Sequence, residues 1–215
     1  MKTFTTRTFI TINIILISLT LASVFWVDKP LAFFVDKNLK PLDTMIAPII
    51  SFIETIFGFY ISKYLFGFIA IAIGAIGYFK SKKSDIPKIF FFIGVTHIIS
   101  RLTAGIVKNF FLRPRPFEWL SGNNLDFFSN GNSFPSGHTA HFFGLFLPIV
   151  FLYSRYSWII ILPVFVALSR ILANDHYLGD VIAAITIAFL FTWTFAKVFK
   201  IKTRGKDLYI RKPSH

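Results

Sequence analysis

Long apolar runs separated by short polar connections dominate the sequence. A transmembrane helix needs about 20 mostly apolar residues, and five runs reach this length: roughly Thr8–Trp26, Tyr60–Phe79, Ile89–Phe110, Ser157–Leu172 and Val181–Phe199. A sixth run, His138–Tyr153, is shorter but strongly apolar, and Ser154 and Arg155 close it. The pattern predicts an all-α, polytopic bundle of six transmembrane helices in a single membrane-embedded domain, residues 1–215.

The first outer connection, Lys37–Phe59, has its own periodicity. Its apolar residues recur at helical spacing, and polar residues such as Asp43, Ser51 and Glu54 fall between them. This pattern favours a short amphipathic helix that lies at the membrane interface. A short seventh span is the competing interpretation, and Pro48 and Glu54 weigh against it.

The start of the chain also has two interpretations. Lys2 and Arg7 precede the first apolar run, as they would in a secretory signal peptide. The run is longer than a typical signal core, however, and no clear A-x-A cleavage site follows it. We therefore expect an uncleaved first helix.

Composition supports a membrane protein and excludes several other classes. Hydrophobic residues make up 54% of the chain and charged residues 15%, whereas soluble domains have about 25% charged residues. The chain has no cysteine, which excludes disulfides, thiolate metal sites and cysteine nucleophiles. A net charge of +13 is compatible with nucleic-acid binding, but 29 Phe and so few charges favour a lipid bilayer.

The positions of lysine and arginine predict an orientation. The N-terminal stretch, the loop Lys80–Lys88, Arg155 and the tail from Lys197 hold 14 of the 23 basic residues. Because basic residues favour the cytoplasmic side, both termini are expected there, with residues 200–215 as a basic tail near anionic lipid. In a bacterial cell this corresponds to the inner membrane, with three outer connections facing the periplasm.

Chemistry-bearing residues gather at the outer helix ends of this topology. Lys108, Arg113 and Arg115 end the third helix, Ser136 and His138 begin the fourth, Arg170 ends the fifth, and His176 and Asp180 lead into the sixth. Such cations suit a phosphate group, and the free N–H groups after Pro135 would point at an anion, with Gly137 allowing close approach. Asp175 and Asp180 are the only acids near this site in the sequence, too few to predict a metal site.

Two histidines suggest a division of labour. His176 and Asp180 are four residues apart, so on a helix the carboxylate can hold one ring nitrogen. The other nitrogen would attack phosphorus and form a phosphohistidine, which splits phosphoryl transfer to water into two displacements. His138, on another element, could protonate the leaving alcohol and then activate water.

Three linked motifs resemble those of the type 2 phosphatidic acid phosphatase family. They are Lys108 with six residues before Arg115-Pro116, Pro135-Ser136-Gly137-His138, and Ser169-Arg170 with five residues before His176 and three more before Asp180. The resemblance implies a metal-free mechanism without cofactors, in which His176 is the nucleophile, Asp180 orients it and His138 is the general acid. It also implies that Lys108, Arg115, Ser136, the Gly137 amide and Arg170 bind the phosphoryl oxygens. The membrane spans favour the lipid phosphatase branch of this family.

Residues outside the motifs allow two readings. His97, Arg101 and Lys108 share one stripe of the third helix, with Arg101 about 10 Å deeper than Lys108. Arg101 could support the site or pair with a helix carbonyl, and His141 could support His138 or simply pack. Arg113 is near the phosphate site without belonging to the motifs. In the long outer loop, aromatic residues such as Trp119 are interpreted as interface anchors or as a lid over a headgroup.

The sequence thus predicts a lipid phosphatase that acts at the outer face of the membrane. Lipid A or another envelope lipid phosphate is the first expected substrate, and an isoprenyl diphosphate or phosphatidylglycerophosphate the second. A phosphotransferase that passes phosphate to another lipid, and a non-catalytic transporter or scaffold, are the alternatives. A phosphorylated membrane lipid and the bilayer are the expected partners, and nucleic acid is not.

Overall fold

The computed structural model describes residues 5–80, 85–122 and 127–201. The elements of this part are all helices: α1 (Thr6–Ala22), the π-helical turn η1 (Ser23–Val27), α2 (Asp28–Asn38), α3 (Lys40–Ile56), α4 (Leu65–Lys80), α5 (Ile86–Phe111), α6 (Pro116–Leu120), α7 (Gly137–Leu152), the 3-10 helix η2 (Ser154–Ile160), α8 (Ile161–Leu172) and α9 (Leu178–Val198). The predicted all-α fold is therefore confirmed. The predicted basic tail lies almost entirely outside the described residues.

Four helical stretches are long and apolar enough to cross a membrane by length and composition. They are Thr6–Asn38, Ile86–Leu120, Ser154–Leu172 and Leu178–Val198. The two further predicted spans correspond to the apolar helices α4 and α7, which are shorter. The chain is thus a multi-pass membrane protein, and the count of six spans stays a prediction.

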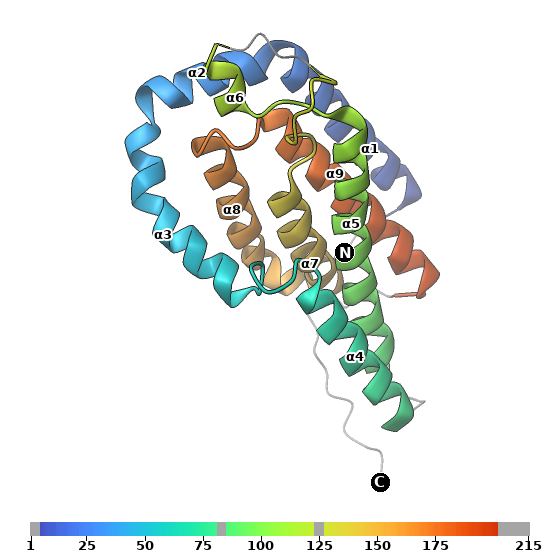
Figure 1. Ribbon diagram of the computed structural model, residues 1–215. Helices are drawn as coiled ribbons and strands as arrows, with labels where there is room; N and C mark the ends of the chain where they lie inside the picture. Colours follow the sequence, from blue (N-terminus) through green and yellow to red (C-terminus); the bar gives the residue numbers. More distant parts are fainter. Residues whose placement is uncertain (1–4, 81–84, 123–126, 202–215) are drawn as a thin grey trace.

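Helices α5, α7 and α9 form the centre of the bundle, with α1 against α9 and α4 against α5 (Figure 1). One fully buried alanine from each central helix (Ala104, Ala140 and Ala184) forms a small cluster. Glycine serves the same purpose between α4 and α5, where a Cβ on Gly94 would lie 2.6 Å from the carbonyl oxygen of Gly67. Small side chains allow the backbones to approach closely, as is common in membrane helix packing.

Helices α2 and α3 pass round the α8 side of the bundle (Figure 1). The helix predicted in the first outer connection is confirmed as α3, but its faces are oriented differently from an interfacial helix. Ile50 and Glu54 point inward and are 1% and 3% exposed, while Met45 and Phe52 are exposed. Because Ile50 packs with Phe142 of α7 and Val166 of α8, α3 brings the Glu54 carboxylate into the protein.

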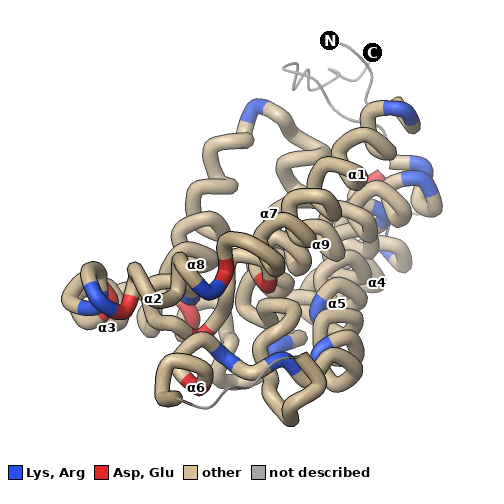
Figure 2. The backbone as a smooth tube through the Cα atoms, turned by 90° about the horizontal axis from the view of Figure 1, so that it is seen from above, with Lys and Arg blue, Asp and Glu red and all other residues tan. Residues whose placement is uncertain are grey.

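The helix ends that carry the predicted site meet at one end of the bundle. Basic residues cluster around the end of α5 and near α6, with acidic residues among them (Figure 2). The long outer loop between α5 and α7 contains the short helix α6 among its described residues. Arg115 is the N-cap of this helix, and its backbone N–H donates to the Glu118 carboxylate at 2.6 Å.

Candidate active site

A cavity of about 550 Å³ lies where these helix ends meet. Six of the predicted site residues line it: Arg101, Lys108, Arg115, Gly137, His138 and His176. They come from α5, the α5–α6 connection, α7 and the α8–α9 connection. The three motifs, far apart in sequence, therefore converge on one cavity as expected.

The Pro135-Ser136-Gly137-His138 motif begins α7, as predicted. Ser136 is the N-cap, and its hydroxyl accepts from the backbone N–H of Thr139 at 3.4 Å. The Thr139 hydroxyl lies 2.9 Å from the same oxygen. The Ser136 side chain is thus fully buried in capping the helix, and it is absent from the residues that line the cavity. Its phosphate-binding role stays a prediction.

His176 is buried at the floor of the site, with 3% of its surface exposed. Its Nδ1 lies 3.6 Å from Oδ2 of Asp180 and 3.4 Å from the hydroxyl of Ser133. The expectation that both residues lie on one helix is wrong, because α9 begins at Leu178. The pair forms because Asp180, in the first turn of α9, also accepts from the backbone N–H of Tyr177 at 2.8 Å.

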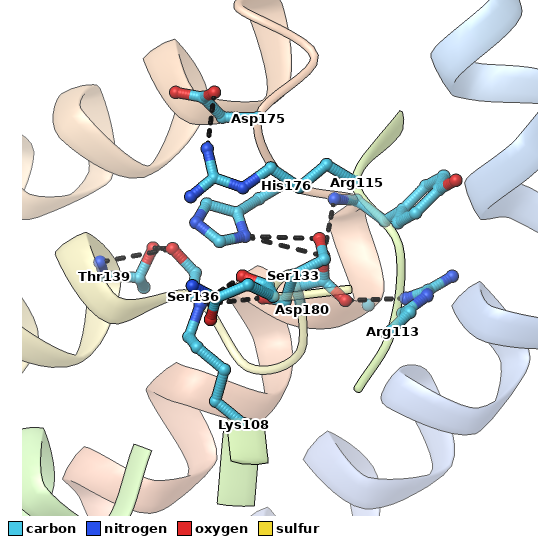
Figure 3. A network of polar contacts seen from close by, with 12 residues as sticks. Lys108, Arg113, Arg115, Ser133, Ser136, Thr139, Asp175, His176 and Asp180 are labelled. Carbon is cyan, nitrogen blue, oxygen red and sulfur yellow. Dashed lines mark hydrogen bonds and ion pairs between the residues drawn. The ribbon is translucent and has the colours of Figure 1, made fainter. Parts of the chain in front are cut away.

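Asp180 belongs to a buried polar network, most of which Figure 3 shows. Arg113 donates to Asp180 at 2.6 Å, and the Ser133 hydroxyl donates to the other carboxylate oxygen. The other terminal nitrogen of the Arg113 guanidinium donates to Asp28 at 2.7 Å. Asp28 also accepts from the backbone N–H of Gly179 at 2.8 Å. Both carboxylates are buried and paired with the same guanidinium, so the orientation of Asp180 is fixed from several directions.

Burial lowers the pKa of the His176 imidazole, and the contact with Asp180 opposes this effect only in part. A lowered pKa keeps the ring neutral at neutral pH. With Nδ1 facing Asp180 and Ser133, Nε2 lies on the opposite side of the ring (Figure 3). A neutral imidazole with one fixed nitrogen and one unblocked nitrogen has the features that a nucleophile requires.

His138 has a different environment. Its ring stacks on Phe59 with centroids 4.1 Å apart. Its Nε2 lies 3.3 Å from the Glu54 carboxylate, which accepts from the Tyr60 hydroxyl at 2.8 Å. Each of the two histidines that are predicted to be catalytic therefore has its own carboxylate: Asp180 for His176 and Glu54 for His138. A carboxylate at this distance can fix the orientation of the His138 ring.

Arg115 and Arg170, the two arginines expected to bind phosphate, both contact the carboxylate of Asp175. Arg115 donates to one oxygen of Asp175 at 3.0 Å, and Arg170 contacts the other at 3.4 Å. Arg170 also lies 3.4 Å from Glu54. Arg115 lines the cavity, whereas Arg170 does not, so direct phosphate binding by Arg170 stays a prediction.

Lys108 reaches across to the loop that carries Ser133. Its ammonium group donates to the carbonyl of Asn132 at 2.7 Å and lies 3.4 Å from that of Ser133. Lys108 thus fixes this loop while it lines the cavity. The same cation can bind a phosphoryl oxygen and position the hydroxyl that holds Asp180.

His97 and His141 form a pair away from the reacting groups. Nε2 of His97 and Nδ1 of His141 are 3.0 Å apart, and the latter nitrogen lies 3.0 Å from the carbonyl oxygen of Lys63. Both rings are fully buried. They attach the α3–α4 connection to α5 and α7, so His141 supports the wall of the site.

Four contributing residues lie outside the sequence prediction: Asp28, Glu54, Ser133 and Lys63. The expectation that Asp175 and Asp180 are the only acids near the site is wrong, because Asp28 and Glu54 reach it from α2 and α3. A charged residue within an otherwise apolar segment was the available signal for Glu54. In the described residues, His, Asp and Glu side chains form no group of three that could hold a metal ion.

Comparison with known proteins agrees with the geometry. Residues 89–204 match the model of the PAP2 superfamily. The chain is 25% identical to undecaprenyl-diphosphatase BcrC of Bacillus subtilis (strain 168), over 68% of this chain and 74% of that protein. It is 27% identical to the bacitracin transport permease protein BcrC of Bacillus licheniformis, over 65% and 71% of the two chains. No solved structure gives a significant match. The chain belongs to the PAP2 superfamily and is a lipid phosphatase of the hydrolase class.

Proposed function

We propose that this protein hydrolyses an isoprenyl diphosphate at the outer face of the membrane, through a phosphohistidine formed on His176. The cavity is the observation that carries the proposal. It places His176, His138 and two phosphate-binding cations, Lys108 and Arg115, around one space at the ends of the helices. Leu102 and Ile106 also line it, and both are exposed on α5, so a lipid substrate can enter from the bilayer.

The proposed reaction has two displacements. Nε2 of His176 attacks the terminal phosphorus, and the bond from that phosphorus to the bridging oxygen breaks. His138 gives a proton to the departing oxygen, and Lys108 and Arg115 hold the oxygens of the transferred group. A water molecule then loses a proton to His138 and attacks the phosphohistidine, which releases inorganic phosphate and restores both rings.

The choice of substrate changes the order expected from sequence. One relative is named an undecaprenyl-diphosphatase, which favours an isoprenyl diphosphate over lipid A. Phosphatidylglycerophosphate, phosphatidic acid and lipid A become the comparison substrates. The outer location is supported by the distribution of basic residues, because the site lies at the ends opposite Lys80, Arg155 and Lys197.

The decisive experiment measures inorganic phosphate released by purified protein from this panel of lipids. Wild-type protein should release phosphate from the isoprenyl diphosphate fastest, and His176→Ala should release none. Lys40→Gln, at an exposed lysine on α3 whose side chain is 74% exposed, is the matched control and should retain activity. Equal turnover by His176→Ala would refute the phosphohistidine.

The same assay separates the two alternative functions. A phosphotransferase would produce a second phosphorylated lipid in place of free phosphate. A transporter, suggested by the permease name of the second relative, would function without the nucleophile, so His176→Ala would retain it. Vanadate, which mimics five-coordinate phosphorus, should inhibit only an enzyme that passes through such a state.

A further inference from the structure

Arg101 is a buried cation that the mechanism above does not use. It is 8% exposed, and its guanidinium makes no hydrogen bond or ion pair with any residue of the described chain; its Nε is buried without a partner. The interpretation that it pairs with a helix carbonyl is therefore not supported. A buried charge without a partner is costly, and such a charge at membrane depth indicates a functional site.

The guanidinium of Arg101 points to the catalytic cavity. Arg101 lines this cavity together with Lys63 and Tyr64. A Cβ on Gly137 would lie 3.3 Å from both Cζ and Nη2 of Arg101, so the guanidinium lies against the residue that precedes His138. The unpartnered cation therefore adjoins the group that protonates the leaving oxygen.

Lys63 lines the same cavity as Arg101. Lys63 is an exposed residue at the edge of this cavity. Its backbone carbonyl oxygen lies 3.0 Å from Nδ1 of the buried His141. The His97–His141 pair thus positions the segment that carries Lys63. Two cations, Arg101 and Lys63, are in this way added to Lys108 and Arg115 around one cavity.

The position of Arg101 along α5 indicates which part of a substrate it would meet. It lies seven residues before Lys108, which is about 10 Å deeper along the helix. A lipid diphosphate has its terminal phosphate farthest from the lipid chain and its second phosphate nearer the chain. With the terminal phosphate at His176 and Lys108, the second phosphate would lie on the deeper side.

We propose that Arg101 and Lys63 form a separate subsite for the phosphate that remains on the lipid. This inference rests on the proposed function, because it assigns the leaving-group side of the same reaction. When the bond to the bridging oxygen breaks, negative charge develops on the phosphate that stays on the lipid, His138 protonates the departing oxygen, and the lipid leaves as a phosphate monoester that is still anionic. A monophosphorylated lipid leaves instead as a neutral alcohol after protonation by His138, and it has no group for these two cations to bind.

The test compares two substrates in each variant: an isoprenyl diphosphate and the matching isoprenyl monophosphate. Arg101→Gln should lower kcat/KM for the diphosphate so that the ratio of diphosphate to monophosphate activity falls about tenfold or more, as expected for loss of a charged hydrogen bond. Lys63→Gln should lower the same ratio to a smaller extent, because this side chain is exposed. Lys40→Gln is the control and should leave the ratio unchanged.

Inhibition gives an independent readout that requires no turnover of a lipid. Methylenediphosphonate, which carries two phosphoryl groups, should inhibit wild-type protein more strongly than inorganic phosphate does. Arg101→Gln and Lys63→Gln should raise its inhibition constant by about tenfold or more, and that of inorganic phosphate much less. An exposed Lys63 is not part of the core, so Lys63→Gln provides the test even where Arg101→Gln does not fold.

The outcomes separate the subsite from the proposed function. If wild-type protein releases no phosphate, or if His176→Ala is active, the proposed function fails. If wild-type protein and the His176 variant behave as expected but both cation variants keep the wild-type substrate ratio and inhibitor selectivity, only the subsite is refuted. A parallel fall in activity on both substrates would also refute it, because the cations would then serve the shared phosphate.

Discussion

At the residue scale, the proposed nucleophile His176 must be neutral to attack phosphorus, and its surroundings favour this state. Burial lowers its pKa below the ordinary value of 6.5. Protonation therefore removes the nucleophile only at a lower pH, and we predict that the acidic limb of kcat/KM lies below pH 6.5. The measurement is a pH profile divided by the fraction of dianionic substrate, because a phosphate ester itself ionises near pH 6. A limb above pH 6.5 would contradict a neutral, buried His176.

The assignment of His138 as general acid gives a second prediction, based on the leaving group. His138→Ala should lower kcat/KM on an alkyl phosphate by about 10²–10⁴-fold, because the departing alcohol needs a proton in the first displacement, which kcat/KM reports. With p-nitrophenyl phosphate the loss in kcat/KM should be much smaller, since nitrophenolate leaves without protonation. Equal losses on both substrates would assign His138 to phosphate binding.

Glu54 extends this prediction, because it contacts both His138 and Arg170. If the carboxylate acts through His138, Glu54→Gln should show the same dependence on the leaving group, with a total loss of about tenfold for a lost charged contact. Thr55→Ala, an exposed neighbour on α3, is the control. A loss confined to KM on both substrates would show that Glu54 acts through Arg170.

The residues of the three motifs could be predicted because fixed spacing and residue type identify them together. The roles of Asp28 and Glu54 could not be predicted in this way, since each is a single acid more than 80 residues from its partner. A single acid forms no motif with a fixed spacing. Arg113 was adjacent to the motif, but its two carboxylate partners appear only when α2 and α9 are packed side by side. The polar network therefore depends on tertiary contacts that local patterns do not contain.

At the scale of the elements, Asp28 connects the N-terminal helices to the catalytic region. It bridges Arg113 and the first turn of α9, and it accepts from the Ser23 hydroxyl at 2.6 Å. Removing one partner of a buried ion pair typically costs about 3–5 kcal/mol. We predict that Asp28→Asn lowers the free energy of unfolding in detergent by a loss of this order and also reduces kcat.

The matched control is Asp36→Asn, eight residues further along α2. Asp36 pairs with Lys40 at 3.5 Å, and both side chains are largely exposed, so its loss should cost about 0–1 kcal/mol. Thermal unfolding followed by circular dichroism measures both variants. If the two variants were equally stable, Asp28 would not fix the N-terminal helices to the site.

The helices themselves follow closely from apolar periodicity. The predicted fourth span begins at His138, and α7 begins at Gly137, because Ser136 provides an N-cap that the motif displays. For α3 the periodicity indicated a helix but not its orientation, since the inward position of Glu54 depends on partners from α7 and α8. The predicted start of the second span at Tyr60 was five residues early, because residues 57–64 form turns, from which Phe59, Lys63 and Tyr64 line the cavity.

At the scale of the whole molecule, the site forms because all the helix ends that carry its residues lie at the same end of the bundle. Helices α5 and α8 end there, whereas α7 and α9 begin there. Alternating directions of successive helices produce this arrangement only if each intervening helix crosses the membrane. Helices α4 and α7 have 16 residues each, so each would be only about 24 Å long against a hydrocarbon core of about 30 Å. Helix α4 decides on which side of the membrane the site lies relative to the N-terminal helices.

A membrane can thin locally, and flanking aromatic residues can anchor a short helix, so we predict that α4 crosses it. The chain has no cysteine, which allows single-cysteine labelling with a membrane-impermeant maleimide in spheroplasts. Lys40→Cys, before α4, should be labelled at once, and Lys88→Cys, after it, only once the membrane is permeabilised. Labelling of both in intact spheroplasts would mean that α4 does not cross, and the reverse pattern would place the site on the cytoplasmic side. Because Lys40 and Lys88 both belong to exposed ion pairs, neither substitution should disturb the bundle, and the labelling pattern reports topology alone.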